Sequence, residues 1–412
     1  MSLLSKLADT SRASSLGTDA SDKCDLDALI RSLMIACPDP TLEDRARDAH
    51  RLRGQHLARQ DMWEKLADEI FRADKTRQAT PGRMAVSELL SYGARSDVVL
   101  AAEHALQDGK PAKDAPVMEG IEGLEEMLAE SDGDPMCAIV VAQAHMDLGW
   151  AWRGTGQNDR VKPRNREAFE AHFDRAGDIL DSLEAECDRS PLFHSAKCAL
   201  NGAGLNPQHR IARDYEKLID LNPQNPSPMR ALGTYLSPRW FGSHQELEIE
   251  ARRTASRTQA EWGAGGYAWV MFDVLVGDTV ACENLDLEFF VEGLEDILTC
   301  SPEQHTANLL AAFCAHIHTG ENDGSAAAIK ARDAIAGCAD WIIRRHLTEL
   351  HPMIWAHAAA GFANNVNVTS PRRFAAMGQR YGLRVIAQLF HREIEEGRRI
   401  IFTADGPVAE PC

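Results

Sequence analysis

The spacing of apolar residues in 211–226 and in the segment that follows restricts the fold of this chain more than any other feature. Apolar side chains recur there at intervals of four and three residues, the repeat of one helix face, at Ile211, Tyr215 and Leu218. Pro223 follows where such a helix ends, and a second apolar pattern with the pair Leu232-Gly233 begins shortly afterwards. The sequence therefore predicts two successive helices joined by a short turn that is closed by proline.

The same 3.6-residue periodicity continues along almost the whole chain from Leu26 onward, without a convincing run of alternating β-branched residues. This pattern predicts an all-α protein built from helix pairs with short connections. Residues 91–96 are expected to form the turn of one such pair. Helices are expected at 42–74 with a break near 60–61, 83–92, 97–107, 118–130, 136–153, 167–187, 193–205, 209–221, 227–236, 244–257, 263–276, 287–298, 302–318, 326–347, 352–362 and 372–399.

The pairs Leu148-Gly149 and Leu232-Gly233 occupy equivalent places in two expected helices, and Leu200 occupies the same place in a helix between them. Together with the proline that closes the partner helix, these residues resemble the tetratricopeptide repeat (TPR). The resemblance is good over residues 136–260 and implies an irregular TPR-like α-α superhelix, a right-handed solenoid of antiparallel helix pairs. Separations of 52 and 32 residues between the three leucines make the repeat irregular.

A second local pattern lies in the turn within 236–247, where Trp240 and the pair Gly242-Ser243 follow a proline. Ser243 has the side chain of a helix N-cap, and Glu246 stands three residues later, as in a capping box. The pattern resembles an uncharacterised family of bacterial TPR-like proteins, a domain of unknown function. This resemblance implies no activity.

Composition divides the chain into five expected parts. The segment 108–115, DGKPAKDA, combines glycine, proline and charge as linkers do, and it marks a subdivision. A long last helix suits a cap, because a repeat array must cover its terminal apolar face. The parts are a flexible N-terminal arm at 1–22, an N-terminal helical subdomain at 23–110, TPR-like repeats at 116–320, C-terminal capping helices at 321–402 and a polar tail at 403–412.

The 44 basic and 62 acidic residues give a net charge of −18, which repels the phosphates of nucleic acids and the surface of anionic membranes. We therefore expect neither as a partner. The first residues lack the apolar core of a signal peptide, and the most hydrophobic windows are too short to cross a bilayer. The sequence accordingly favours a cytoplasmic protein.

No familiar catalytic or cofactor motif occurs in the chain. A phosphate-binding G-x-x-x-x-G-K-[ST] loop, a G-x-S-x-G elbow, a dinucleotide fingerprint and an H-E-x-x-H pair are all missing. His316 and His318 would lie about 200° apart on a helix, which prevents them from sharing a metal ion. The sequence thus indicates no catalytic residue, no metal site and no cofactor.

Five of the eight tryptophans lie between residues 150 and 269, and arginines stand close to several of them. A flat indole beside guanidinium groups suits an acidic or C-terminal peptide. In the alternative interpretation, Trp150 packs against a neighbouring helix, while Trp240 fills a gap between helix pairs and Arg239 binds carbonyls or an acidic neighbour. In a TPR-like array, the residues expected on the inner surface are Gln143, Trp150, Arg153, Arg230 and Thr234, with Arg239 and Trp240 at its edge.

These observations favour a non-catalytic binding or scaffolding protein of the TPR-like type, with a protein or peptide as its partner. Two other functions stay open. One is an enzyme with a pocket in the concave face of the array, closed by the polar insertion at 157–166. The other is a regulatory or neutralising accessory protein that acts through its acidic charge. The sequence indicates neither the identity of the partner nor an oligomeric state.

Ten cysteines are spread along the chain without any C-x-x-C pair, and the chain shows no export signal. We therefore predict that all ten are free thiols. Titration of freshly purified protein under denaturing, non-reducing conditions should find nearly all ten thiols reactive. Several protected thiols would show that the protein belongs to an oxidising compartment.

Overall fold

The computed structural model describes residues 28–106, 109–112, 117–154, 161–203, 210–318, 324–362, 368 and 370–411. The chain is 73% helix with little strand, which confirms the prediction of a mostly helical protein. The expected N-terminal arm at 1–22 lies outside the described residues. The chain divides into two compact units: unit 1 comprises Met1–Thr41 and Ser243–Cys412, and unit 2 comprises Leu42–Gly242.

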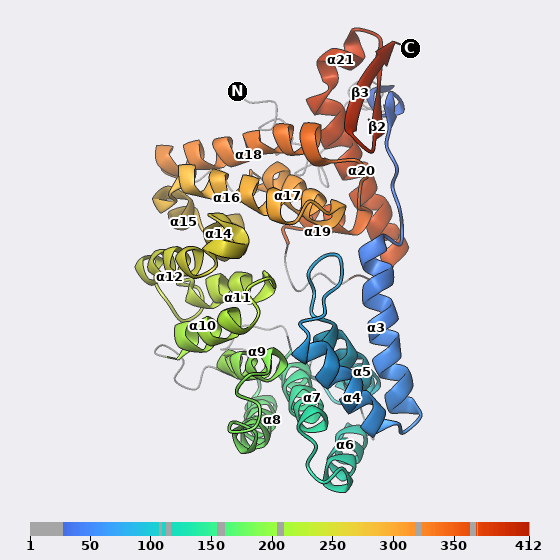
Figure 1. The fold of residues 1–412 in the computed structure, drawn as a ribbon, viewed down its shortest axis with the longest axis vertical. Helices are drawn as coiled ribbons and strands as arrows, with labels where there is room; N and C mark the ends of the chain where they lie inside the picture. Colours follow the sequence, from blue (N-terminus) through green and yellow to red (C-terminus); the bar gives the residue numbers. More distant parts are fainter. Residues whose placement is uncertain are drawn as a thin grey trace. The chain divides into compact units, whose positions relative to one another are not determined.

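Unit 2 is built from helices, coloured from blue to green in Figure 1. Most of them agree with the predicted ranges to within a few residues, and α11 has the predicted bounds. They are α3 (Leu42–Arg59), α4 (Trp63–Lys75), α5 (Val86–Leu106), α6 (Glu119–Glu130), α7 (Pro135–Arg153), α8 (Pro163–Ser182), α9 (Pro191–Leu200), the short 3-10 helix η3 (Asn201–Ala203), α10 (Ile211–Leu221) and α11 (Ser227–Leu236).

Helix α5 differs from the sequence prediction, which placed a turn at 91–96 between two helices. A single helix runs through these residues. A side chain at Gly93 would collide with the backbone carbonyl of Arg51 on α3, and one at Gly54 of α3 would collide with the carbonyl of Leu90. The two glycines therefore allow the backbones of α3 and α5 to approach closely, and Gly93 does not end the helix.

The predicted boundary near residue 110 does not separate the two units. Helix α5 before it and helix α7 after it pack against each other within unit 2. Both contribute to one hydrophobic cluster, to which α5 brings Leu90 and Val99 and α7 brings Ile139 and Val140. A connection inside a domain can have the same composition as a linker between domains, because turns and linkers both favour glycine, proline and charged residues.

Unit 1 consists of helices and one small sheet, coloured from yellow to red in Figure 1 except for its blue first strand. Ser243 accepts a hydrogen bond from the backbone of Glu246 at 3.2 Å, which confirms it as the N-cap of α12. The elements are β1 (Leu33–Met34), α12 (His244–Arg257), α13 (Gln259–Trp262), α14 (Gly265–Gly277), α15 (Thr279–Asn284), α16 (Leu287–Cys300), α17 (Gln304–His316), α18 (Ala326–His346), α19 (Pro352–Ala359), α20 (Pro371–Leu389), α21 (His391–Glu395), β2 (Arg398–Thr403) and β3 (Gly406–Pro411).

The sheet was not expected from the sequence. Strand β2 pairs in parallel with β1, where Leu33 lies opposite Ile400, and antiparallel with β3, where Phe402 lies opposite Pro407 and Arg398 opposite Pro411. The expected polar tail at 403–412 therefore contains a strand, and the helix expected at 372–399 ends at residue 389. The strands are short, and β1 comes from the other end of the chain, which leaves little local alternation to detect.

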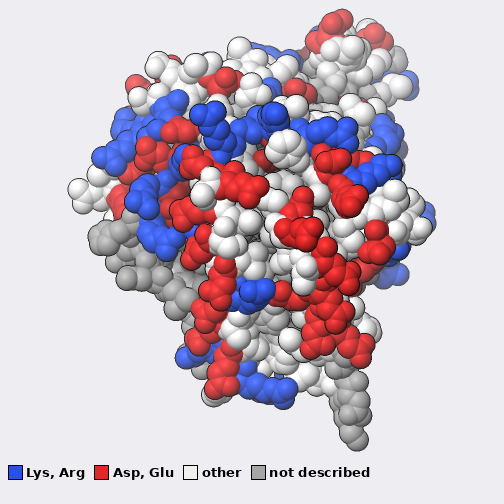
Figure 2. Space-filling model, turned by 60° about the horizontal axis from the view of Figure 1, so that its bottom comes forward, with Lys and Arg blue, Asp and Glu red and all other residues white. Residues whose placement is uncertain are grey.

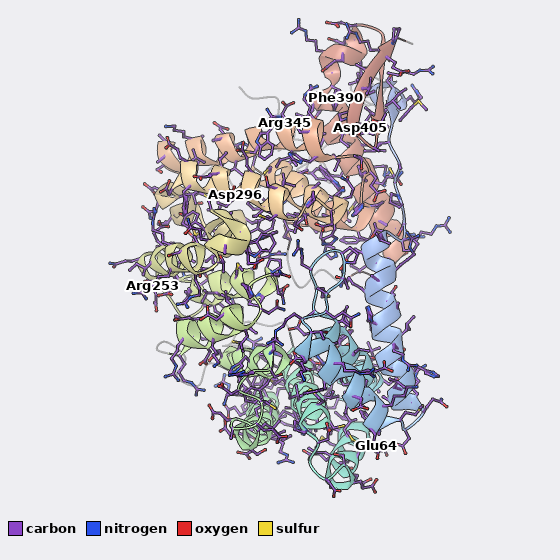
Figure 3. The ribbon with its side chains drawn as sticks, viewed as in Figure 1. Glu64, Arg253, Asp296, Arg345, Phe390 and Asp405 are labelled. Atoms are coloured by element: carbon purple, nitrogen blue, oxygen red, sulfur yellow. The ribbon has the colours of Figure 1, made fainter. Side chains whose placement is uncertain are left out.

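Arg344 of α18 holds the end of unit 1 that carries the hairpin. Its guanidinium carbon lies 4.2 Å from the ring centroid of Phe390, within the range of a cation–π contact. The same guanidinium group donates to Glu393 and to the carbonyl of Leu389, each at 2.8 Å. Figure 3 places Phe390 at this end, close to Asp405 of the hairpin turn. One arginine thus ties α18 to the end of α20 and to α21.

The acidic balance of the sequence is visible on the surface. Figure 2 shows Asp and Glu gathered in broad bands over the lower half of the face that it presents, with Lys and Arg fewer there. Within the described parts of the chain, no helix combines the length and the apolar character needed to cross a membrane.

Eight of the ten cysteines fall among the described residues, and these eight are unpaired. Cys24 and Cys412 lie outside the described residues. Burial raises the pKa of Cys137 to about 12 and that of Cys187 to about 11. Because the thiolate is the reactive form, these two thiols are poor nucleophiles in the folded protein.

A chain of polar side chains connects α6, α7 and α8. His145 Nε2 donates to Glu125 at 2.9 Å, so the Nδ1 atom of the neutral His145 ring accepts from His172 Nδ1, also at 2.9 Å. Arg175 donates twice to the Glu125 carboxylate, at 2.6 Å in each case. Both histidines are buried, and burial lowers the pKa of each, that of His172 to about 4.

The low pKa of His172 makes the stability of unit 2 depend on pH. The unfolded chain takes up this proton near the ordinary value of 6.5, whereas the folded chain does so near 4. The stabilising contribution is therefore complete above pH 6.5 and is lost as the pH falls from 6.5 to 4. A shift of this size corresponds to about 3 kcal/mol.

We predict that His172→Asn flattens this pH dependence, because asparagine keeps a donor near the Nδ1 position but does not titrate. Between about pH 7 and about pH 4.5, the variant should lose less unfolding free energy than the wild type, by up to about 3 kcal/mol. Urea denaturation followed by tryptophan fluorescence measures both values. His104→Asn, at an exposed histidine of α5, serves as the control. Equal pH dependence in His172→Asn and the wild type would contradict the prediction.

Candidate functional site

All seven residues predicted for binding belong to unit 2, where they form two groups. One group lies on α7, and the other lies on α11 and the turn after it. The first group is Gln143, Trp150 and Arg153, and the second is Arg230, Thr234, Arg239 and Trp240. The residues that lie between the groups decide whether they form one surface.

Trp150 is half-buried on the side of α7 that meets α8. Its ring contacts Phe169 edge-on at a centroid distance of 5.1 Å and Phe173 at 5.9 Å. Arg153 places its guanidinium carbon 5.4 Å from the indole centroid, within the range of a cation–π contact. Trp150 therefore packs against a neighbouring helix, as the alternative interpretation expects, and part of its side chain also stays accessible.

Gly202 of η3 joins the two groups. A Cβ atom at this position would lie 3.1 Å from Cζ2 of Trp150 and 3.1 Å from the hydroxyl oxygen of Tyr235 on α11. Both rings thus lie against a residue that has no side chain. The Tyr235 ring continues to Phe241 and Trp240, with centroid distances of 6.0 and 5.7 Å. We call Trp150, Tyr235, Phe241 and Trp240 the aromatic row.

The turn after α11 holds the exposed end of the aromatic row. The backbone N–H of Trp240 donates to the carbonyl of Ser237 at 2.9 Å. A side chain at Gly242 would collide with the carbonyl of Leu236, so this turn requires glycine. Trp240 is 45% exposed. This exposure differs from the alternative interpretation, in which Trp240 fills a gap between helix pairs.

The other three members of the second group are unequally accessible. The Thr234 hydroxyl donates to the carbonyl of Arg230 at 3.2 Å and is therefore engaged within its own helix. Arg230 itself is half-buried on α11. Arg239 is exposed, and its guanidinium group makes no hydrogen bond or ion pair with any other described residue. Arg239 is thus the member of this group best placed to meet a ligand together with Trp240.

Gln143 belongs to a polar network between α5 and α7. Its side-chain oxygen accepts hydrogen bonds from the Ser91 hydroxyl at 2.5 Å and from Arg95 Nη1 at 3.1 Å. Arg95 also donates from Nε to Asp147 at 2.6 Å, and the side chains of this ion pair are 11% and 32% exposed. Because the network already uses the amide oxygen, Gln143 joins two helices and leaves little of that oxygen for a ligand.

Two further carboxyl groups lie near this network. Burial raises the pKa of Glu88, although a hydrogen bond from the Ser195 hydroxyl at 2.8 Å opposes part of the rise. Burial and the charge of Asp147 raise the pKa of Glu103. Both groups keep a proton to higher pH than a fully hydrated glutamate does. Their contribution to the negative charge of α5 therefore falls early when the pH is lowered.

The sequence analysis missed Ser91, Arg95 and Asp147. Ser91 and Arg95 stand four residues apart on α5, and Gln143 and Asp147 stand four apart on α7, which is the spacing of neighbours on one helix face. This signal was present in the sequence. The turn predicted at 91–96 obscured it, and no local pattern shows that α5 and α7 touch.

The assembled side chains are suited to recognition. The aromatic row offers contact area at a low cost in rotamer entropy, and arginine offers paired N–H donors that match a carboxylate. In the portion of the chain that the structure describes, no three His, Cys, Asp or Glu side chains are arranged to hold a metal ion. Comparison with protein-family models, curated proteins and solved structures found no match for this chain. Its function is therefore argued from these residues.

The Arg95–Asp147 ion pair should be strongly coupled, because it is mostly buried and shares the polar network. In a double-mutant cycle with Arg95→Ala and Asp147→Ala, we expect a coupling energy of about 1–3 kcal/mol. The pair Arg59–Asp97 in the same unit is the control, since its side chains are 59% and 44% exposed. Its cycle should give less than about 1 kcal/mol. Urea denaturation measures both coupling energies. Equal values for the two pairs would contradict the prediction.

Proposed function

We propose that this protein is a non-catalytic binding module of the TPR-like type and that unit 2 holds a protein or peptide segment along the aromatic row. The observation that supports this most is that Trp150 of α7 and Tyr235 of α11 both lie against the backbone of Gly202. Tryptophan, tyrosine and arginine are the side chains that most often dominate binding energy at interfaces. The row combines them with an exposed end at Trp240.

The TPR-like part of the proposal rests on helix packing within unit 2. Helix α7 packs against α8, and α9 packs against α10, which is the order of successive helix pairs (Figure 1). Leu148 and Leu232 are buried, and a side chain at Gly149 would lie 3.0 Å from the ring of Phe173. The TPR pattern has a leucine that packs between the two helices of a pair and a glycine that lets these helices approach each other. An irregular right-handed superhelix would continue this order.

The charge of the surface suggests the chemistry of the bound segment. Arg153, Arg230 and Arg239 belong to the two groups that border the aromatic row, whereas the chain as a whole carries −18. Arginine binds carboxylates through two parallel hydrogen bonds. We therefore propose an acidic or C-terminal peptide as the partner. The free cysteines among the described residues fit a cytoplasmic setting, which completes the proposal.

The proposal is tested with peptides selected from a displayed library for binding to the full chain. Trp240→Ala and Trp150→Ala should each weaken the binding of a selected peptide by about 1–4 kcal/mol, and Arg230→Ala should do the same. Isothermal titration calorimetry measures the affinities, and circular dichroism shows whether helicity is retained. Trp240 is the safest position, because its exposed side chain contributes least to the core.

Phe71→Ala is the matched control for Trp240→Ala. Phe71 lies on α4 of the same unit, is 50% exposed and has Lys75 above its ring, so that it offers similar chemistry at another place. This variant should keep full affinity. If Trp240→Ala, Trp150→Ala and Arg230→Ala all keep full affinity, the aromatic row is not the binding site. Unfolding of Trp150→Ala would show that Trp150 serves the core, and Trp240→Ala would then decide the proposal alone.

A further inference from the structure

One part of this acidic protein has no acidic residue. No Asp or Glu occurs between Glu349 and Glu393, a stretch that includes the whole of α20. The same stretch contains five arginines and no lysine, so its formal charge is +5 within a chain of −18. Four of the arginines lie on α20, namely Arg372, Arg373, Arg380 and Arg384. We call these four side chains the arginine stripe.

Packing of α20 turns the arginine stripe outward. Gly378 meets the backbone of α19 at Pro352, and a side chain at Gly382 would lie 2.9 Å from the ring of Trp355. The arginines at 373, 380 and 384 recur at intervals of seven and four residues, which places them together on the opposite side of the helix. Three members of the stripe are exposed and Arg384 is half-buried. Met377, between them, is 39% exposed.

The guanidinium groups of the arginine stripe have no partner among the residues that the structure describes. None of them makes a hydrogen bond or an ion pair there. Arg344, in the same unit, shows the contrast: it donates to Asp340 and Glu393 and covers the ring of Phe390. Among the described residues of unit 1, the arginine that connects helices is therefore paired and the stripe is not.

The charges of the arginine stripe lower the stability of α20. Arg372 and Arg373 lie in the first turn of α20, where the helix dipole is positive and cations are unfavourable. Arg380 and Arg384 stand four residues apart, where like charges repel each other. These costs bring no compensating contact with the described residues of unit 1. A local arrangement that opposes stability without a structural return points to an interaction with another molecule.

We infer that the arginine stripe docks an acidic segment of a partner protein. From Arg373 to Arg384 the stripe is about 17 Å long, at ~1.5 Å per residue. An acidic segment of a few turns matches this length, offers carboxylates to the guanidinium forks and can place one apolar side chain on Met377. Arginine and methionine together are typical of protein interfaces.

Two other polyanions fit the arginine stripe less well. Double-stranded DNA carries one negative charge per ~1.7 Å, and it extends beyond the ends of the stripe. There its phosphates are repelled by the net negative charge of the protein. A membrane needs apolar side chains to insert, and the opposite face of α20 is occupied by its contact with α19. The inference does not depend on the aromatic row, because the two surfaces belong to different units.

The test uses the full chain and a fluorescein-labelled peptide of twelve residues, ten glutamates with two central leucines, in a low-salt buffer. Fluorescence anisotropy should show saturable binding that weakens as salt is added. The triple variant R373Q/R380Q/R384Q should bind the peptide about tenfold more weakly or worse. The control R45Q/R47Q/K65Q removes the same charge from exposed residues of unit 2 and should stay within about twofold of the wild type. W240A should also keep its affinity.

Several outcomes would overturn the inference. They are an absence of peptide binding at low salt, equal losses in the triple variant and the control, and a loss in W240A that equals the loss in the triple variant. Stripe-dependent binding that is tighter for a twenty-nucleotide single-stranded DNA, or for phosphatidylserine vesicles, would assign the stripe to another polyanion. If the triple variant loses helicity, the single variants R373Q, R380Q and R384Q replace it, each with a loss of about two- to fivefold.

Discussion

Unit 2 depends on the burial of α7, most of whose side chains are buried and which packs against α4, α5, α6, α8 and α9 (Figure 1). Removal of this surface from water stabilises the unit, but a helix that is apolar all round has no amphipathic pattern to fix its rotation. Polar contacts fix the rotation of α7 about its axis instead. Arg95 binds Asp147 from α5, and His172 binds His145 from α8. A rotation of α7 would break the Arg95–Asp147 and His145–His172 contacts and leave these polar groups without partners. These contacts therefore fix the direction in which Trp150 points, although Trp150 does not take part in them.

Helix bounds were predictable where a helix carries its own end signals. Helices α11 and α12 have the predicted ranges, because Ser243 and the prolines and glycines around them mark their ends. Helix α5 was predicted as two helices, since glycine and serine in 91–96 indicate a turn when only local sequence is considered. The crossing of α5 with α3 explains Gly93, and the polar network with α7 explains Ser91. The sheet escaped prediction for a similar reason, because β1, which pairs with the hairpin of β2 and β3, lies far away in the sequence.

The candidate site was predictable only in part. The TPR-like spacing singled out Trp150 and Trp240 on two helices, but it did not show that Gly202 and Tyr235 connect them. Periodicity assigns a residue to a face of its own helix, whereas contact between helices depends on how they cross. The same limit hid the partners of Gln143, whose amide oxygen serves the α5–α7 network. Gln143 is therefore less available to a ligand than its residue type suggests.

The hairpin of unit 1 also limits the addition of a further strand to its sheet. In an antiparallel pair, every second residue of a strand directs its N–H group toward the neighbouring strand, and the residues between direct theirs away. Pro407 and Pro411 have no N–H group, and they alternate with Ala409 along β3. The outer edge of β3 is consequently left with Ala409 as its donor in this register. An extended segment of a second molecule would find carbonyl acceptors but a single N–H donor there, so it could not form a regular ladder, and the described sheet has three strands.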